Sequence, residues 1–417
     1  MDDYMDIIAV DNAPKDDGAH LLAGSFQTLT IGTLKKPRTT DDFVHNSEFL
    51  AEVTEHMPHT LHSADSLVSS TVLRKCPFVH CISAELATHR PSGFQYLQLP
   101  PTDDGDGRQS ESCWDDDGQE KLPGNKLLVR PSYIDIANIL LYETRIVDGT
   151  KKTRNNMILS GTSGMGKSYF TRFFVWYLLH APTGFKVPET IVWGSTQAGD
   201  GGCLYYKGAL FIIDKLQSFI SAHKHGARLL DSTDSWLIFD GSALKDIPEC
   251  RCLMISSSPG NLQRDEQAIK SFSKSSTRVY LPPWSIEELI TANEIVYNIP
   301  ATNDTIQDLI NRLKWYGGNA RYVLQYKRFL PWTQALVTED ERVLLRDVTG
   351  DAVNTGRVIQ IINELGLSEL AYSEASGVLL QVTPDETYRK FTYEWASYRT
   401  MRMAFTNLFK VGHKIVQ

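Results

Sequence analysis

The 417-residue sequence lacks the features of several large protein classes. It contains no apolar run of about 18 residues, the length with which a helix crosses a bilayer. Its six cysteines are scattered without a regular framework, which favours reduced intracellular thiols over a disulfide scaffold. A net charge of -8 and a pI near 5.8 argue against a globally basic nucleic-acid binder. Neither a secretory signal nor an internal repeat is visible, so an intracellular globular protein without a membrane anchor is expected.

The strongest positive signal is a phosphate-binding loop, the P-loop, whose pattern is G-x-x-x-x-G-K-S. Backbone N–H groups in such a loop cradle phosphates, Lys167 reaches the β- and γ-phosphates, and the Ser168 hydroxyl binds Mg²⁺. We expect nucleoside triphosphate, most simply ATP, and Mg²⁺ as the cofactors. The predicted nucleotide-binding residues are Gly161, Thr162, Ser163, Gly164, Met165, Gly166, Lys167, Ser168 and Tyr169.

The flanks of this loop have the patterns that a P-loop requires. Met157–Leu159 is a short apolar strand before the loop. Large apolar residues recur at helical spacing from Lys167 to His180, which predicts a helix whose positive N-terminal end points at the phosphates. Further strand-like segments alternate with helix-like ones up to about residue 281, and this alternation indicates an α/β fold with a mostly parallel sheet covered on both faces.

A P-loop needs a partner carboxylate for Mg²⁺, and it usually ends an apolar strand. Asp240, after Trp236–Phe239, is the preferred metal ligand together with Ser168, and Asp214, after Phe211–Ile213, is the rival. A further strand, Arg251–Ser256, leads to Ser257, which is placed to help position water beside the γ-phosphate. Many ATPases with an inserted strand between the two motifs carry, directly after this aspartate, a glutamate that orients water. Here Gly241 follows Asp240, so slow hydrolysis, use of another residue, or use of the nucleotide as a switch all stay open.

A small helical lid is expected after the last strand. Ser285 and Glu288 have capping-box spacing at the start of one helix. A second helix spans about Thr305 to Tyr316, and Arg321, a few residues later, is a candidate sensor of the γ-phosphate. The catalytic candidates are therefore Lys167, Asp240, Ser257 and Arg321.

The chain is predicted to divide into four segments. Residues 1–125 form a variable N-terminal region that includes a carboxylate-rich stretch, Thr102–Glu120, best interpreted as a solvated linker. Residues 126–284 form the P-loop core, residues 285–330 the helical lid, and residues 331–417 a C-terminal α/β extension.

The order of these motifs resembles a known family. The segments that carry the resemblance are Val129–Tyr133, Gly161–Ser168, Trp236–Asp240, Ser257–Pro259, Tyr280–Ser285, Gly317–Arg321 and Lys390–Ser397. Together they resemble the P-loop NTPase of Crinkler-type effectors and the related retrotransposon hot spot proteins. Ser163 and Met165 replace the Pro and Ile that are usual in that family's loop, and Ala320 replaces a Pro. The resemblance implies an additional-strand P-loop ATPase of the AAA+ or signal-transduction type, and it implies secretion and action in a host nucleus.

Three functions follow as hypotheses. The first is a Mg²⁺-dependent NTPase whose hydrolysis gates a conformational or oligomeric change, and the second is a nucleotide-binding switch with negligible turnover. The third is an NTPase module that controls nucleic-acid binding, for which two short basic runs, Lys35–Arg38 and Lys151–Arg154, are the only support. The expected partners are a nucleoside triphosphate, further copies of the chain, and a host or nuclear protein.

Overall fold

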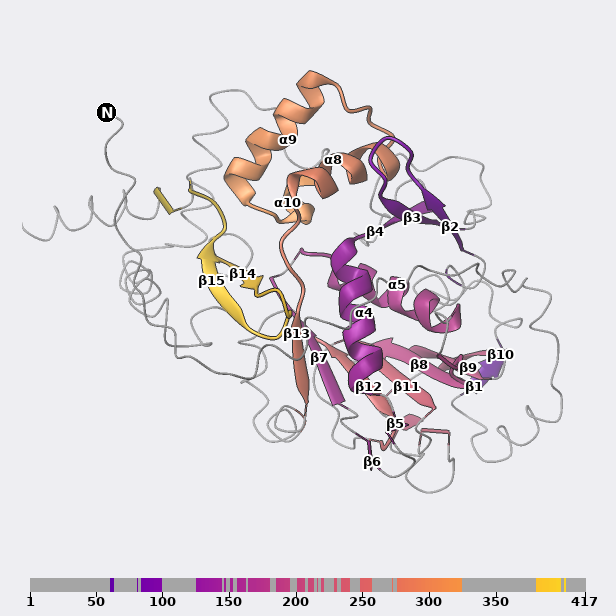
Figure 1. Cartoon of the computed structure of the whole chain (residues 1–417). Coiled ribbons are helices and arrows are strands. Elements are labelled where there is room, and N and C mark those ends of the chain that lie inside the picture. The colour runs from indigo at the N-terminus through magenta and orange to yellow at the C-terminus, as the bar shows by residue number, and fades with distance from the viewer. Residues whose placement is uncertain are drawn as a thin grey trace, which may run out of the picture.

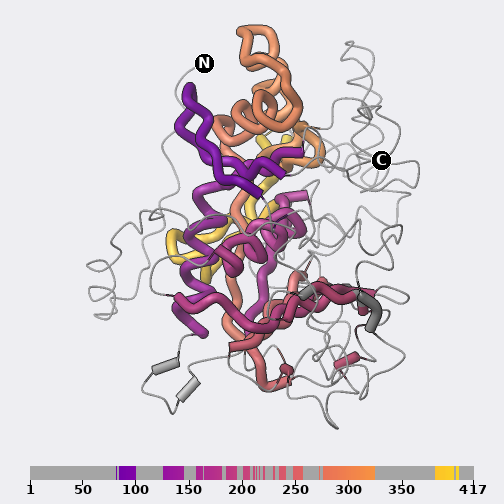
Figure 2. Tube along the Cα trace, turned by 90° about the vertical axis from the view of Figure 1, so that its right-hand side faces the viewer, coloured from indigo at the N-terminus to yellow at the C-terminus, as the bar shows by residue number. Residues whose placement is uncertain are grey.

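The fold is seen in a computed structural model (Figures 1 and 2). It describes residues 61–63, 81–99, 125–324 and 380–402, with internal gaps at 82–83, 145, 148–150, 153–155, 163, 181–184, 196–200, 207–208, 214–215, 217–218, 221–228, 231–233, 241–247, 257–271, 273–275 and 399–400. Among these residues no helix is both long and apolar enough to cross a membrane.

A sheet of eight strands forms the centre of the molecule, in the order β1-β10-β9-β8-β11-β12-β7-β13. Five neighbouring strands of it are parallel, as the sequence predicts for most of the sheet. Burial of nearly every residue in these strands explains their continuous apolar runs, because helices or loops cover both faces of a parallel sheet. The parallel strands are β8 (Thr190–Ser195), β11 (Ser235–Asp240), β12 (Arg251–Ile255), β7 (Asn156–Ser160) and β13 (Thr277–Tyr280).

The position of β12 defines the type of sheet. It lies between β7, which leads into the P-loop, and β11, which ends at Asp240, and it pairs in parallel with both. This is the additional strand that the family resemblance implies, and the fold class is therefore confirmed as an additional-strand α/β P-loop fold.

The other half of the sheet is antiparallel, which sequence patterns did not indicate. Strand β9 (Gly202–Tyr206) turns back along β8, and β10 (Ala209–Ile213) turns back along β9. Strand β1 (Leu61–Ser63), from far upstream, closes this edge. Because β9 and β10 are joined by only two residues, they form a hairpin rather than the crossover that a parallel pair requires.

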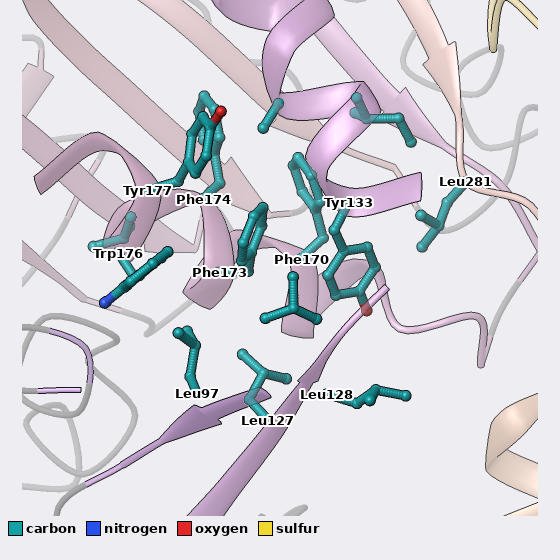
Figure 3. Packing of buried hydrophobic residues seen from close by; sticks show 14 of the residues in the cluster. Leu97, Leu127, Leu128, Tyr133, Phe170, Phe173, Phe174, Trp176, Tyr177 and Leu281 are labelled. Carbon is teal, nitrogen blue, oxygen red and sulfur yellow. The ribbon is translucent and has the colours of Figure 1, made fainter. Parts of the chain in front are cut away.

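Two helices cover one face of the sheet, as Figure 1 shows. Helix α4 (Pro131–Glu143) begins with proline at its first position, where the missing N–H costs nothing. Helix α5 (Lys167–Leu179) follows the P-loop. Aromatic side chains join the layers, since Phe170 meets Tyr133 of α4 edge to face (Figure 3). Phe174 meets Trp236 of β11 in the same manner.

The opposite face of the sheet has a separate apolar cluster. Its described members include Val192, Leu237 and Met254 from the strands. Leu216, Phe219 and Phe272 pack over them from outside the sheet. Burial on this face agrees with the expectation of a sheet covered on both sides.

A three-stranded antiparallel sheet lies beside the lid helices in both views (Figures 1 and 2). It consists of β2 (Glu85–Thr88), β3 (Gln95–Gln98) and β4 (Lys126–Val129). Strand β4 runs directly into Arg130 and α4, so this small sheet is continuous with the layer that borders the P-loop. A short separate ribbon pairs β5 (Ile146–Val147) with β6 (Lys151–Lys152).

Three helices follow the last core strand: α8 (Ile286–Ile295), α9 (Asn303–Tyr316) and α10 (Ala320–Leu324). The capping box predicted at the start of α8 is confirmed, since Ser285 Oγ accepts from Glu288 N and Glu288 accepts from Ser285 N. Helix α9 ends at Gly317, whose φ of 60° is the left-handed region that glycine tolerates.

A hairpin of β14 (Leu380–Pro384) and β15 (Phe391–Trp395) returns the chain to the core. Its turn meets the free edge of β13, where Tyr280 N donates to Tyr388 O over 2.9 Å. Figure 1 shows it in yellow beside β13. The segments 1–125 and 331–417 thus both send strands against the core, and the division into four domains stays a proposal.

Candidate nucleotide-binding site

The P-loop joins the carboxyl end of β7 to the N-terminus of α5. Its first residue, Gly161, follows β7 directly, and its last glycine, Gly166, is the N-cap of α5. The strands β11 and β12 end at the same edge, since they run parallel to β7. In open α/β sheets this edge is where ligands bind.

Two glycines of the loop are required by their backbone conformation and their surroundings. Gly164 has φ of 83°, and a Cβ there would collide with the side chain of Asn319. Gly166 has φ of 94°, and a Cβ there would lie 2.6 Å from the Tyr133 hydroxyl. The glycines of the motif thus allow both the turn and the close approach of neighbouring side chains.

Lys167 is the most strongly perturbed ionisable group of the site. Its Nζ is buried and donates to Gly161 O over 2.9 Å and to Thr162 O over 2.8 Å. Burial lowers its pKa from 10.5 to about 7; the charge of Asp240 opposes this shift, and that of Arg321 adds to it. Both of these acceptors are neutral carbonyls, so an anionic phosphate would satisfy a cation that the fold has already desolvated.

Asp240 ends β11, two strands from β7 and therefore about 10 Å across the sheet. The influence of Asp240 on the pKa of Lys167 places its charge near the P-loop. The rival, Asp214, lies outside the described residues. Strand β10, which precedes it, is five strands from β7, or about 24 Å. The sheet order therefore favours Asp240.

Arg321 lies at the start of α10, with its side chain exposed. Its backbone N–H donates to Gly164 O over 3.4 Å, and its charge also acts on Lys167. Asp240 and Arg321 are thus the two charged groups that act on Lys167. Their catalytic roles stay predictions.

The remaining predicted residues divide into two groups. Ser168 is exposed at the N-terminus of α5, Tyr169 is half-buried beside it, and Thr162 and Met165 are buried in the loop. Ser163 and Ser257 lie outside the described residues, although Ser256, just before Ser257, donates its N–H to Leu159 O of β7.

Side chains that the sequence did not assign to the site hold one side of the P-loop, which we call the rear wall: Arg130, Tyr133 and Trp284. Trp284 Nε1 donates to Met165 O over 2.9 Å, and Arg130 Nη1 donates to the same oxygen over 3.3 Å. Tyr133 Oη donates to Gly166 O over 2.8 Å. All three side chains are buried at 9% exposure or less.

Arg130 also ties the rear wall to the lid. Its guanidinium forms a two-pronged pair with Glu288 of α8, with distances of 3.0 Å and 2.9 Å, and donates to the carbonyls of Pro282 and Pro283. The Trp284 ring lies over it, with the centroid 4.6 Å from Arg130 Cζ. The buried charge is thus paired and surrounded by acceptors, as its desolvation requires.

A second set of contacts with the loop, which we call the front wall, is made by two backbone N–H groups, those of Val382 and Arg321. Val382 N, from β14, donates to Thr162 Oγ1 over 2.8 Å. The Arg321 contact with Gly164 is described above. No local pattern could have predicted the first contact, because 220 residues separate its partners. The sequence marks two segments of the rear wall as motifs but assigns them no role in the site, namely Val129–Tyr133 and Tyr280–Ser285.

The order of the strands, the P-loop and the carboxylate at the end of β11 together define the fold class. It is an α/β P-loop fold of the additional-strand type. No family model matches the chain. It is similar to Crinkler effector protein 15 of Phytophthora infestans, with 24% identity over 292 residues, which cover 67% of this chain and 39% of that protein. The chain thus spans well under half of that relative's length. The comparisons give no support for the retrotransposon hot spot part of the resemblance.

Two solved structures share a coarser likeness. One is the ORC2 protein of Aeropyrum pernix in ADPNP–ADP complexes, with TM-score 0.33 and 14% identity, covering 68% of this chain and 94% of that one. The other is Cdc6p of Pyrobaculum aerophilum, with TM-score 0.27 and 10% identity, covering 67% and 93%. The fold assignment here rests on the strand order and not on these scores.

Proposed function

We propose that the chain binds a nucleoside triphosphate, most simply ATP, with Mg²⁺ at the P-loop, and that binding and hydrolysis gate a conformational or assembly change. The observation that carries the proposal is the Lys167 ammonium, desolvated among backbone carbonyls at the N-terminus of α5. A helix N-terminus adds favourable potential for an anion at the same place.

The residues present suit Mg²⁺. A serine hydroxyl and a carboxylate are hard oxygen donors, the kind that Mg²⁺ takes together with phosphate oxygens and waters. Ser168 is exposed at the loop, and Asp240 ends the neighbouring part of the sheet. When bound, Mg²⁺ supplies positive charge to the phosphate oxygens. Ser168 and Asp240 would hold it, while Lys167 would neutralise the phosphates from the other side.

The gating part of the proposal rests on the front wall. The lid reaches Gly164 through α10, and the C-terminal hairpin reaches Thr162 through β14. A phosphate that reshapes the loop would therefore change the contacts of two elements at once. We propose that a second copy of the chain, or a host or nuclear protein, contacts the chain at these two elements.

A nucleotide switch with negligible turnover is the second candidate. It is favoured by Gly241, which follows Asp240 where a glutamate would orient the attacking water. As a further proposal, the resemblance to Crinkler-type effectors implies secretion and action inside a host nucleus. Control of nucleic-acid binding has only the two short basic runs in its favour.

The deciding experiment measures phosphate release from ATP and from GTP by the purified chain, with and without Mg²⁺. Lys167→Ala serves as the matched inactive variant. Mg²⁺-dependent release that this variant abolishes establishes an NTPase. Saturable binding without release establishes the switch, and absence of both overturns the proposed function.

A further inference from the structure

The P-loop can bind phosphates only if its N–H groups face the ligand. In a trans peptide the N–H and the preceding C=O point in opposite directions, and the described residues contain no cis peptide. The direction of each carbonyl therefore fixes the direction of the next residue's N–H. Whatever holds the carbonyls of Met165 and Gly166 also aims the N–H groups of Gly166 and Lys167.

Those two N–H groups are available for a ligand. Within the described part of the chain, neither Gly166 N nor Lys167 N donates to another residue. Lys167 N belongs to the first turn of α5, where N–H groups have no intrahelical acceptor. A phosphate oxygen can accept from both N–H groups, provided that the peptides do not rotate.

The carbonyl on the other end of each peptide is held from behind. Met165 O is not part of a helix and accepts from two side chains, Trp284 Nε1 and Arg130 Nη1. Gly166 O accepts from Phe170 N in α5 and additionally from Tyr133 Oη. Hydrogen bonds made by buried, aromatic side chains cost little further ordering, because the rings are already fixed by packing.

From this geometry we propose that Tyr133 and Trp284 are positioning residues for nucleotide binding. Supported by Arg130, they hold the Met165–Gly166 and Gly166–Lys167 peptides with their N–H groups toward the phosphates. Neither side chain needs to touch the nucleotide. The inference rests on the proposed function, since it concerns how the same loop binds its anion.

The test removes one hydrogen-bond donor at a time and keeps an aromatic ring at the position. Tyr133→Phe deletes the donor to Gly166 O, and Trp284→Phe deletes the donor to Met165 O. The chain offers matched controls on the same helix layer. Tyr177→Phe deletes a buried hydroxyl that donates to Asn138 over 2.7 Å, and Trp176→Phe deletes an indole N–H that donates to Ala84 O over 3.1 Å.

Equilibrium binding is measured with Mg²⁺–ATP and with inorganic tripolyphosphate, and thermal unfolding is recorded for every variant. Each loop-facing variant should weaken both ligands about fivefold, the equivalent of one hydrogen bond. The two ligands should weaken by the same factor, because the defect lies under the phosphates and not under the base. The control variants should lose similar thermal stability and keep wild-type affinity. If Trp284→Phe does not fold, Tyr133→Phe, which is the smaller change, serves as the test variant by itself.

The outcomes separate the two proposals. Wild-type protein that binds neither ATP nor tripolyphosphate overturns the proposed function and this inference with it. Wild-type binding that is unchanged in Tyr133→Phe and Trp284→Phe overturns only the inference. Equal weakening in test and control variants also overturns it, since it would mean that general stability and not loop orientation sets the affinity.

Discussion

The rear and front walls hold the same loop by different means. The rear wall uses three buried side chains, and its central charge is paired with Glu288. The front wall uses two backbone N–H groups, from a five-residue helix and a two-stranded hairpin. Elements with few buried contacts open at lower free energy than core elements. The comparison indicates that the rear wall sets the loop's shape, while the front wall is the side that can respond to the ligand.

The largest difference is expected in stability. Arg130→Ala leaves Glu288 buried without its partner and should lower the free energy of unfolding by about 3–5 kcal/mol. Arg389→Ala breaks a more exposed pair with Glu143 at the hairpin and should cost at most about 1 kcal/mol. The free energy of unfolding of both variants is measured by urea titration. Equal losses would contradict the expectation that the buried ion pair of the rear wall contributes more to stability than the more exposed pair of the hairpin.

Asp240, the proposed metal ligand, belongs to neither wall and tests whether the loop acts alone. Asp240→Ala should weaken Mg²⁺-dependent nucleotide binding or turnover on the order of tenfold or more, the loss seen when metal sites are impaired. Asp214→Ala is the matched control and should change little, because β10 is remote from β7. Titration of Mg²⁺ at fixed ATP makes the comparison. The reverse ranking would move the metal role to Asp214.

Nucleotide affinity is expected to depend on pH through Lys167. Burial holds its pKa at about 7 in the free protein, with Asp240 and Arg321 as the charged groups acting on it. A bound polyphosphate favours the ammonium and raises that pKa, so affinity is greatest below pH 7 and falls as pH rises above it. Calorimetry at pH 8 in two buffers of different ionisation enthalpy should show uptake of about one proton per nucleotide. Lys167→Arg, which stays charged, should show none; uptake by both proteins, or by neither, would contradict the assigned pKa.

The smallest effect is expected at the front wall. Thr162→Val removes the acceptor of the Val382 N–H and should speed hydrogen exchange across residues 380–395 about fivefold, the equivalent of about 1 kcal/mol. Thr162→Ser keeps the hydroxyl and should exchange like the wild type. Nucleotide should slow exchange in the wild type and not in Thr162→Val. Identical exchange in all three proteins would show that the hairpin is independent of the loop.

The sequence predicted the parts of the fold that depend on local pattern. Apolar strands before polar residues located β7, β11 and β12, and helical spacing located α5. The capping box at Ser285 was predictable because its partners are three residues apart. The additional strand followed from the resemblance, and the sheet order bears it out.

What the sequence did not reveal depends on contacts between distant segments. Strand β9 was missed because Gly202–Tyr206 has no polar alternation and contains a glycine and a cysteine. Arg130 and Trp284 are 35 and 119 residues from Met165, so their motifs were visible but their shared target was not. The hairpin contact with Thr162 spans 220 residues. Such roles arise only when tertiary packing brings the groups together.

The most direct test of the central claim is equilibrium binding of Mg²⁺–ATP to the wild type and to Lys167→Ala. Replacing Lys167 removes a charge that the fold buries at a cost, so the variant should unfold at an unchanged or higher temperature. It should bind about 10- to 100-fold more weakly, the loss expected for a charged hydrogen-bond donor to phosphate. Equal affinity in a folded Lys167→Ala protein would contradict the assignment of this loop as the nucleotide site.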